Sequence, residues 1–136
     1  MPAGTPGLLL WDVVNEPETG GATNLPGEPA GPRWTFVKWA VKYMQSVTKT
    51  PTTVGVAEVG SLATVGSAVD ILSFHSYHNT WEDGLLATQS ALGFAAQFNK
   101  PVFNSETGCI ARANAFDQTV EMAVSNGIGY VHPTSI

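Results

Sequence analysis

The chain has 136 residues, of which 43% are hydrophobic and only 12% are charged, so it is expected to form one well-packed globular domain and not a disordered segment. Its formal net charge is −5 and its basic residues form no cluster, which excludes nucleic acid and an anionic membrane surface as expected partners. Because Cys109 is the only cysteine, the chain can form neither an internal disulfide nor a cysteine-based zinc site.

Strand and helix patterns alternate in the first half of the chain. Residues 8–14 are a continuous apolar run, which is typical of a strand covered on both faces. Residues 18–32 are rich in Gly, Pro, Thr and Asn and predict a long loop, residues 33–49 predict a helix, and residues 53–57 predict the second strand. The apolar stripe expected on this helix consists of Val37, Ala40, Val41, Met44 and Val47.

The alternation continues to the end of the chain. The further expected elements are, in order, a short helix over 62–69, a strand over 70–75, a helix over 83–98, a strand that starts at Pro101, a helix that Asn114 caps, and a strand over 128–132. The apolar stripe expected on the last helix consists of Phe116, Val120, Ala123 and Val124. Repeated strand–helix–strand units indicate an α/β fold with a parallel sheet.

Polar side chains follow the predicted strands at the points where these strands end. They are Asn15, Glu16, Glu58, His75, Tyr77 and Glu106. Parallel α/β folds place their functional sites at the carboxyl ends of the strands. The sequence therefore predicts that these side chains gather at one edge of the sheet.

Two of these residues are glutamates that follow apolar strands directly. Glu16 belongs to Asn-Glu-Pro at the end of the first strand, and Glu106 ends the run that starts at Pro101. A carboxylate next to apolar surface can have a raised pKa and act as a general acid. A pair of carboxylates held on rigid strand ends is what cleavage of a glycosidic bond requires.

The segment His75-Ser76-Tyr77 ends the third predicted strand. Residues two apart in an extended segment share a side, so His75 and Tyr77 are expected on one side and His78 on the other. A tyrosine hydroxyl near Glu106 can hold that carboxylate ionised and oriented.

Residues 11–17 (Trp-Asp-Val-Val-Asn-Glu-Pro), then the His-x-Tyr segment, then Glu106 resemble glycoside hydrolase clan A, and most of all family 5, the cellulase and mannanase type. The resemblance extends in order and spacing over nearly the whole chain. It implies a partial TIM (β/α)8 barrel, approximately strands 4 to 8 with the intervening helices. The expected substrate is an oligo- or polysaccharide with β-linkages.

The resemblance also implies roles for individual residues in a retaining mechanism. Glu16 is expected to be the acid/base and Glu106 the nucleophile, with their carboxyl groups ~5–5.5 Å apart. Asn15 is expected to bind the sugar 2-hydroxyl, Tyr77 to hydrogen-bond Glu106, and His75 to line the catalytic subsite. No cofactor and no metal are expected.

The chain also departs from the family pattern. Strands 1 to 3, where the family has an Arg and a His beside the nucleophile, have no counterpart, and residues 130–133 (Tyr-Val-His-Pro) stand where a Trp usually follows strand 8. Residues 1–136 are therefore expected to be the C-terminal part of a catalytic barrel, whose partner is either the N-terminal barrel half or a second copy. Little or no activity is expected from the chain alone.

Other interpretations of the same residues stay open at this stage. Trp81 is expected to stack on a sugar ring, although a packing role fits it equally well, and Trp34 and Trp39 are expected in the core. One alternative function is a non-catalytic glycan-binding remnant. Another is a metal-dependent hydrolase, whose ligands would be His75, His78 and Glu82. A Cys109 thiol nucleophile is not favoured, because nothing in the sequence places a histidine beside it.

Overall fold

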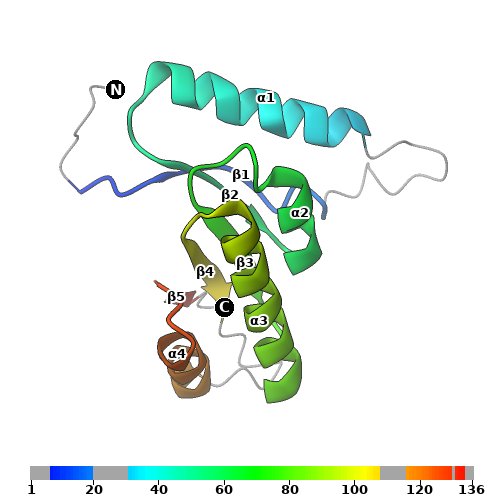
Figure 1. Ribbon diagram of the computed structural model, residues 1–136, viewed down its shortest axis with the longest axis vertical. Coiled ribbons are helices and arrows are strands. Elements are labelled where there is room, and N and C mark those ends of the chain that lie inside the picture. Colours follow the sequence, from blue (N-terminus) through cyan, green and yellow to red (C-terminus); the bar gives the residue numbers. More distant parts are fainter. Residues whose placement is uncertain (1–6, 20–30, 108–115, 130, 134–136) are drawn as a thin grey trace.

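A computed structural model describes residues 7–19, 31–107, 116–129 and 131–133 of the chain (Figure 1). The elements are, in order, β1 (Trp11–Asn15), α1 (Gly31–Val47), β2 (Thr52–Val56), the short 3-10 helix η2 (Val59–Ser61), α2 (Leu62–Val65), β3 (Leu72–Ser76), α3 (Trp81–Phe98), β4 (Val102–Thr107), α4 (Phe116–Ser125) and β5 (Val131–Pro133). This order confirms the predicted alternation of strands and helices.

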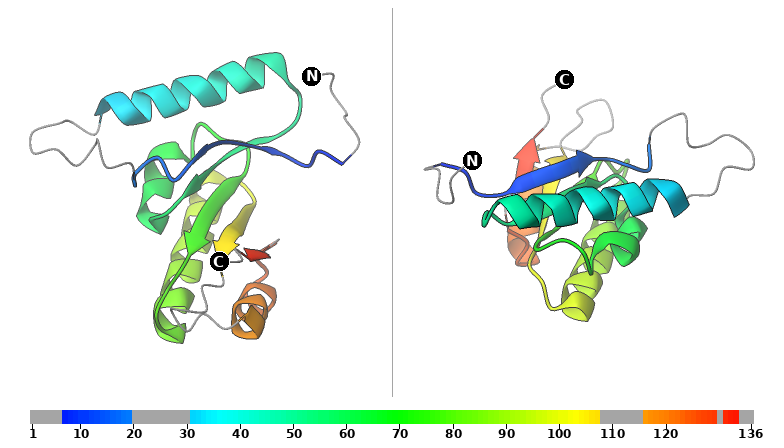
Figure 2. Two further views of the ribbon diagram at one scale, coloured as in Figure 1. Left: turned by 180° about the vertical axis from the view of Figure 1, so that it is seen from behind. Right: turned by 90° about the horizontal axis from the view of Figure 1, so that it is seen from above.

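The strands form one sheet in which each strand pairs with the next one along the chain. In the described residues the sheet has five strands in the order β1-β2-β3-β4-β5, and every neighbouring pair is parallel. Helix α1 packs on β1 and β2, α3 on β3 and β4, and α4 on β5 (Figure 2). The carboxyl ends of all five strands therefore point to the same edge of the sheet, as the sequence predicts.

The hydrophobic core lies between the sheet and these helices. All five residues of β2 and all five of β3 are buried, and Phe74 is among the largest side chains with no exposed surface. Helix α1 contributes Val37 and Val41, four residues apart and hence on one face. Helix α3 begins at a Thr80 cap, whose hydroxyl accepts a hydrogen bond from the N–H of Asp83.

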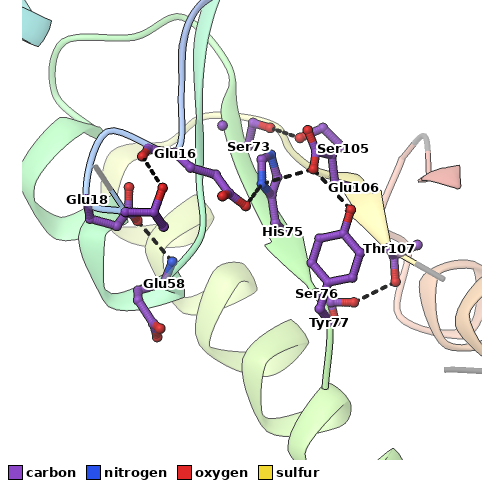
Figure 3. A network of polar contacts seen from close by, with 12 residues as sticks. Glu16, Glu18, Glu58, Ser73, His75, Ser76, Tyr77, Ser105, Glu106 and Thr107 are labelled. Atoms are coloured by element: carbon purple, nitrogen blue, oxygen red, sulfur yellow. Dashed lines mark hydrogen bonds and ion pairs between the residues drawn. The ribbon is translucent and has the colours of Figure 1, made fainter. Parts of the chain in front are cut away.

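The face of the sheet opposite these helices, the inner face, is also buried at β2 and β3. An apolar hollow of about 310 Å³ lies near the amino ends of the strands and is lined mainly by Leu10, Ile71, Val102 and Phe103. Polar side chains gather at the carboxyl ends of the strands, where the candidate site lies (Figure 3).

Some predicted core positions are wrong. Trp39 is 60% exposed, and it stacks between Phe36 and Tyr43 along a flank of α1 instead of packing in the core. The exposed positions on α4 include Val120 and Val124, whereas Met122 and Ala123 are the buried ones. An apolar period identifies a helix but not which of two adjacent apolar flanks the sheet covers. Trp34, in contrast, packs against the core.

Several predictions concern positions outside the described residues. They include most of the loop over 18–32, the Asn114 cap, Cys109 and Tyr130. In the part of the chain that the structure describes, no helix has the length and apolar character to cross a membrane.

Candidate active site

His75 is the centre of a polar cluster at the carboxyl ends of the strands (Figure 3). It lies on β3 and only 3% of the residue is exposed. Its Nδ1 atom is 2.6 Å from Oε1 of Glu16 and 3.6 Å from Oε2 of Glu106. One buried imidazole edge thus faces both predicted catalytic carboxyl groups.

Glu16 is held by its backbone in an unusual conformation. Its φ of 41° lies in the left-handed region, which costs of order 1–3 kcal/mol for a residue with a Cβ. Its N–H donates to the carbonyl of Gly55 at 2.7 Å, and its own carbonyl accepts from both the N–H and the hydroxyl of Thr19. A register shift between Asp12 and Asn15 bends the strand just before it. These contacts direct the Glu16 side chain towards His75.

Glu106 reaches the same point from β4. The hydroxyl of Tyr77 donates to Oε2 of Glu106 at 3.0 Å and orients this carboxyl group. A register shift after Phe74 places His75 opposite Glu106 in the β3–β4 pair. Next to them, the hydroxyls of Ser73 and Ser105 are 2.5 Å apart and link β3 to β4 (Figure 3).

The two carboxyl groups are close enough to act on one atom of a ligand. One oxygen of Glu16, one of Glu106 and a ring nitrogen of His75 all lie within 4.8 Å of one another. Carboxyl groups ~5–5.5 Å apart are typical of retaining glycosidases, whereas inverting enzymes need ~6.5–9.5 Å. The side chains of Glu16 and Glu106 are 24% and 31% exposed, so a ligand can reach both.

The same three donor atoms have the chemistry of a divalent metal site. This set differs from the ligands considered in the sequence, since it contains Glu16 and Glu106 with His75 and includes neither His78 nor Glu82. Oε1 of Glu16 and Nδ1 of His75 already form a short hydrogen bond with each other, and a metal ion would have to break it.

Other predicted residues lie near this cluster without joining it. Asn15 is an exposed residue at the end of β1, next to Glu16 in sequence. Trp81 is the first residue of α3 and is partly exposed. Among the described residues, neither side chain makes a hydrogen bond to Glu16 or Glu106. Glu58 is exposed, and its N–H donates to Oε1 of Glu18 at 2.9 Å, away from His75.

Two residues that the sequence analysis did not select complete the surroundings of His75. Oδ1 of Asp12 accepts a hydrogen bond from the N–H of Gly55 at 3.1 Å. A Cβ added to Gly55 would lie 2.5 Å from Nε2 of His75 and 2.8 Å from Oδ2 of Asp12. Both atoms therefore lie against the bare Cα of Gly55. The available sequence signal was Asp12 itself, a single acid within an apolar strand.

The exposure of Asp12 as a whole residue differs from that of its carboxyl group. Much of the residue is exposed along the open edge of β1, but its carboxyl group is crowded by the inner face of the sheet. Desolvation raises the pKa of the Asp12 carboxyl, while the Gly55 hydrogen bond and the charge of His75 act in the opposite direction. The crowding around the carboxyl group matters more here than the exposure of the whole residue, because the carboxyl group is the part that titrates.

Comparisons with known proteins find no relative in sequence, but they find proteins with a similar fold. No protein-family model matches the chain, and no curated protein matches it. A double mutant of an endo-β-1,4-mannanase from Cellulomonas fimi is similar in structure, with a TM-score of 0.58, 17% identity, and coverage of 84% of this chain and 31% of that one. An engineered protein solved at 1.98 Å is similar with a TM-score of 0.54 and 16% identity, over 76% of this chain and 29% of that one. The chain thus spans less than a third of each solved chain, and its fold is like that of a glycoside hydrolase and consistent with part of a barrel.

Proposed function

We propose that the chain carries the catalytic carboxylates of a retaining glycoside hydrolase that cleaves O-glycosidic bonds in β-linked glycans. The observation that supports this most is the approach of Glu16 and Glu106 to within 4.8 Å at one imidazole edge. The fold likeness to a mannanase agrees with this chemistry. The reaction needs no cofactor and no metal.

In the first step, Glu106 attacks the anomeric carbon and forms a glycosyl-enzyme. Tyr77 supports this role, because its hydrogen bond orients Oε2 of Glu106. Glu16 gives its proton to the glycosidic oxygen as the bond to the leaving sugar breaks. The charge that develops on the leaving group is thereby neutralised.

In the second step, Glu16 acts in the opposite sense. Its carboxylate takes a proton from a water molecule, and the resulting hydroxide attacks the anomeric carbon. The bond to Glu106 breaks, the sugar leaves with its original anomeric configuration, and both glutamates return to their starting protonation states.

Two further residues are assigned to substrate binding. Asn15 adjoins Glu16 and contacts the sugar 2-hydroxyl, and the exposed face of Trp81 stacks on a sugar ring. The cellulase- or mannanase-like class follows from the overall motif and from the mannanase likeness.

The chain corresponds in this proposal to strands 4 to 8 of a (β/α)8 barrel. Strand β1 lies at one edge of the five-stranded sheet, and the aromatic flank of α1 formed by Phe36, Trp39 and Tyr43 is exposed. An N-terminal barrel half or a second copy would cover these surfaces. Little turnover is expected from the chain alone, because the described residues supply no counterpart of the residues that strands 1 to 3 contribute in the family.

Covalent labelling tests the proposal without requiring fast turnover. A 2-deoxy-2-fluoro-β-glycoside with a good leaving group should form a stable ester on Glu106, which intact mass and peptide mass spectrometry detect. Glu106→Gln should not be labelled, and the exposed Asp117→Asn serves as the matched control that should be labelled normally. Labelling at another residue, or equal labelling of Glu106→Gln, would overturn the assignment of the nucleophile.

Glu16 needs a separate test. Glu16→Ala should still be labelled by the activated glycoside but should release the sugar very slowly, and azide should accelerate that release by taking the place of the activated water. Loss of labelling in a folded Glu16→Ala protein would contradict the acid/base role.

A glycan that binds but is never cleaved, with no label on Glu106, would favour a non-catalytic remnant. Activity that chelator abolishes and added metal restores would favour the metal-dependent alternative.

A further inference from the structure

We infer that Asp12 fixes the tautomer of His75, so that the proton resides on Nε2 and Nδ1 accepts a hydrogen bond from the protonated carboxyl group of Glu16. Asp12 is thus a positioning residue that acts through His75. Its catalytic consequence rests on the proposed acid/base role of Glu16. The tautomer itself does not depend on that role.

The two nitrogens of His75 have different surroundings. Nδ1 forms the 2.6 Å contact with Glu16, whereas Nε2 is buried and has no hydrogen-bond partner among the described residues. The ionisable group nearest to that unpaired nitrogen across Gly55 is the carboxyl group of Asp12. A single bridging water molecule would join Nε2 to Oδ2 of Asp12.

The Nε2 side decides the tautomer when Asp12 is ionised, because the Asp12 carboxylate can then only accept a hydrogen bond. A neutral imidazole carries one proton. If that proton is on Nε2, it faces the Asp12 carboxylate in a charge-assisted bond. If it is on Nδ1, the lone pair of Nε2 faces the lone pairs of that carboxylate. Glu16 can satisfy Nδ1 in both cases, by donating its own proton or by accepting one.

The doubly protonated ring would not serve the proposed acid role of Glu16. His75 is almost fully buried, and three carboxyl groups face it. The groups that face the ring are Asp12 from β1, Glu16 from the end of β1 and Glu106 from β4, with the Tyr77 hydroxyl beside the last. An imidazolium would donate to Glu16 and leave it ionised, so no proton would be available for the departing sugar.

The close packing of Gly55 fits this arrangement. Any larger residue at position 55 would insert a carbon atom between Nε2 and Oδ2 of Asp12. The N–H of the same residue binds the other oxygen of Asp12, at 3.1 Å. Gly55 therefore both orients the Asp12 carboxylate and leaves room for its approach to His75.

The tautomer can be measured directly in the unmodified chain. In a protein labelled with ¹⁵N-histidine, long-range ¹H–¹⁵N correlation spectra at neutral pH should show a protonated Nε2 and an unprotonated Nδ1 for His75. His78 and His132 provide the other signals, and His75→Gln identifies the His75 signals by their loss. A protonated Nδ1, or an imidazolium, in the wild-type chain would overturn the inference.

The substitution Asp12→Asn tests whether Asp12 sets the tautomer of His75. The asparagine oxygen can still accept from Gly55 N–H, while its NH₂ group takes the place of Oδ2 and donates to Nε2. The proton of His75 should then move to Nδ1, and Glu16 should become a hydrogen-bond acceptor. Asp83→Asn is the control, because the charge of Asp83 acts on another histidine, His78. An unchanged His75 tautomer in a folded Asp12→Asn protein would also overturn the inference.

The kinetic consequence separates this inference from the proposed function. Asp12→Asn should lower kcat/KM about 100-fold for a substrate whose leaving group needs a proton, and much less for an activated aryl glycoside. The alkaline limb of its pH–rate profile should move to lower pH. If the tautomer changes as expected while Glu16 proves irrelevant to turnover, the proposed function fails and the inference stands. If Glu16 is required but the wild-type ring carries its proton on Nδ1, the inference fails and the function stands.

Discussion

Gly55→Ala offers the sharpest test of how tightly the site is packed. The new Cβ would lie 2.5 Å from Nε2 of His75, although ordinary contacts begin near 3.4 Å, so the ring or the strand has to move by roughly 1 Å. Overpacking of this kind costs about 1–3 kcal/mol. Since His75 is buried between β2 and β4 and has little room to turn, a value in the upper part of that range is expected.

The gain in stability that alanine brings relative to glycine has to be subtracted from this cost. Replacing glycine by alanine in a regular element favours folding by roughly 0.5–1 kcal/mol, because the unfolded chain loses freedom. The net loss of unfolding free energy for Gly55→Ala should therefore be about 1–2 kcal/mol. Because the displaced ring also loses its 2.6 Å contact with Glu16, the tautomer signal of His75 should broaden or shift.

Urea denaturation followed by circular dichroism measures the free energy, and Gly93→Ala is the matched control. Gly93 is an exposed residue of α3, and a Cβ added there would have no neighbouring atom within 4 Å, so this change should stabilise the chain by about 0.5–1 kcal/mol. Equal stability of Gly55→Ala and Gly93→Ala would refute the claim that Gly55 sets the position of His75.

Two further predictions concern parts of the molecule outside the site. Desolvation acts to raise the pKa of the Asp70 carboxyl group, but hydrogen bonds from Thr52 and Gln45 lower this pKa overall. The ionised Asp70 should therefore contribute fully to stability above the ordinary aspartate pKa, and this contribution should disappear as the pH falls below that value. Asp70→Asn should therefore destabilise the chain at pH 7 and have almost no effect near pH 2 in urea titrations, and an equal effect at both pH values would contradict this. Trp39→Glu should lower the weight-average mass of the chain in concentration-dependent sedimentation, because it places a charge in the exposed aromatic flank of α1, and a wild-type chain that is monomeric at every concentration would contradict it.

The sequence predicts the fold order and the position of the carboxylates, but not the local geometry that aims them. Apolar runs and glycine- or proline-containing turns are local signals, so each strand end was within reach of pattern reasoning. The bend before Glu16 and its φ of 41° depend on pairing with β2, which no local pattern contains. The same limit applies to Gly55, whose importance comes from a contact with His75 on another strand.

The exposed position of Trp39 illustrates a different limit. The 3.6-residue period gives α1 two adjacent apolar flanks, one through Val37 and Val41 and one through Phe36, Trp39 and Tyr43. Which flank meets the sheet depends on where the crossover places the helix. An expected core tryptophan can thus become an exposed one without any change in the element itself.

The polar groups of the inner face find their partners within the described strands, whereas the apolar surfaces do not. The polar groups pair between strands. Ser73 binds Ser105 and Tyr77 binds Glu106 between β3 and β4, and His75 on β3 binds Glu16 at the end of β1, across β2. These bonds are satisfied within the chain, so the geometry of the carboxylates can form without a further partner.

The apolar surfaces, in contrast, are not covered by the described residues. The hollow near the amino ends of the strands and the aromatic flank of α1 can be removed from water only by another segment or another molecule. Hydrophobic burial supplies most of the free energy of folding, whereas each hydrogen bond contributes only about 0.5–1.5 kcal/mol. The site is therefore expected to be arranged by the five described strands but stabilised by what covers them, and a partner that covers them should raise stability more than it changes the distance between Glu16 and Glu106.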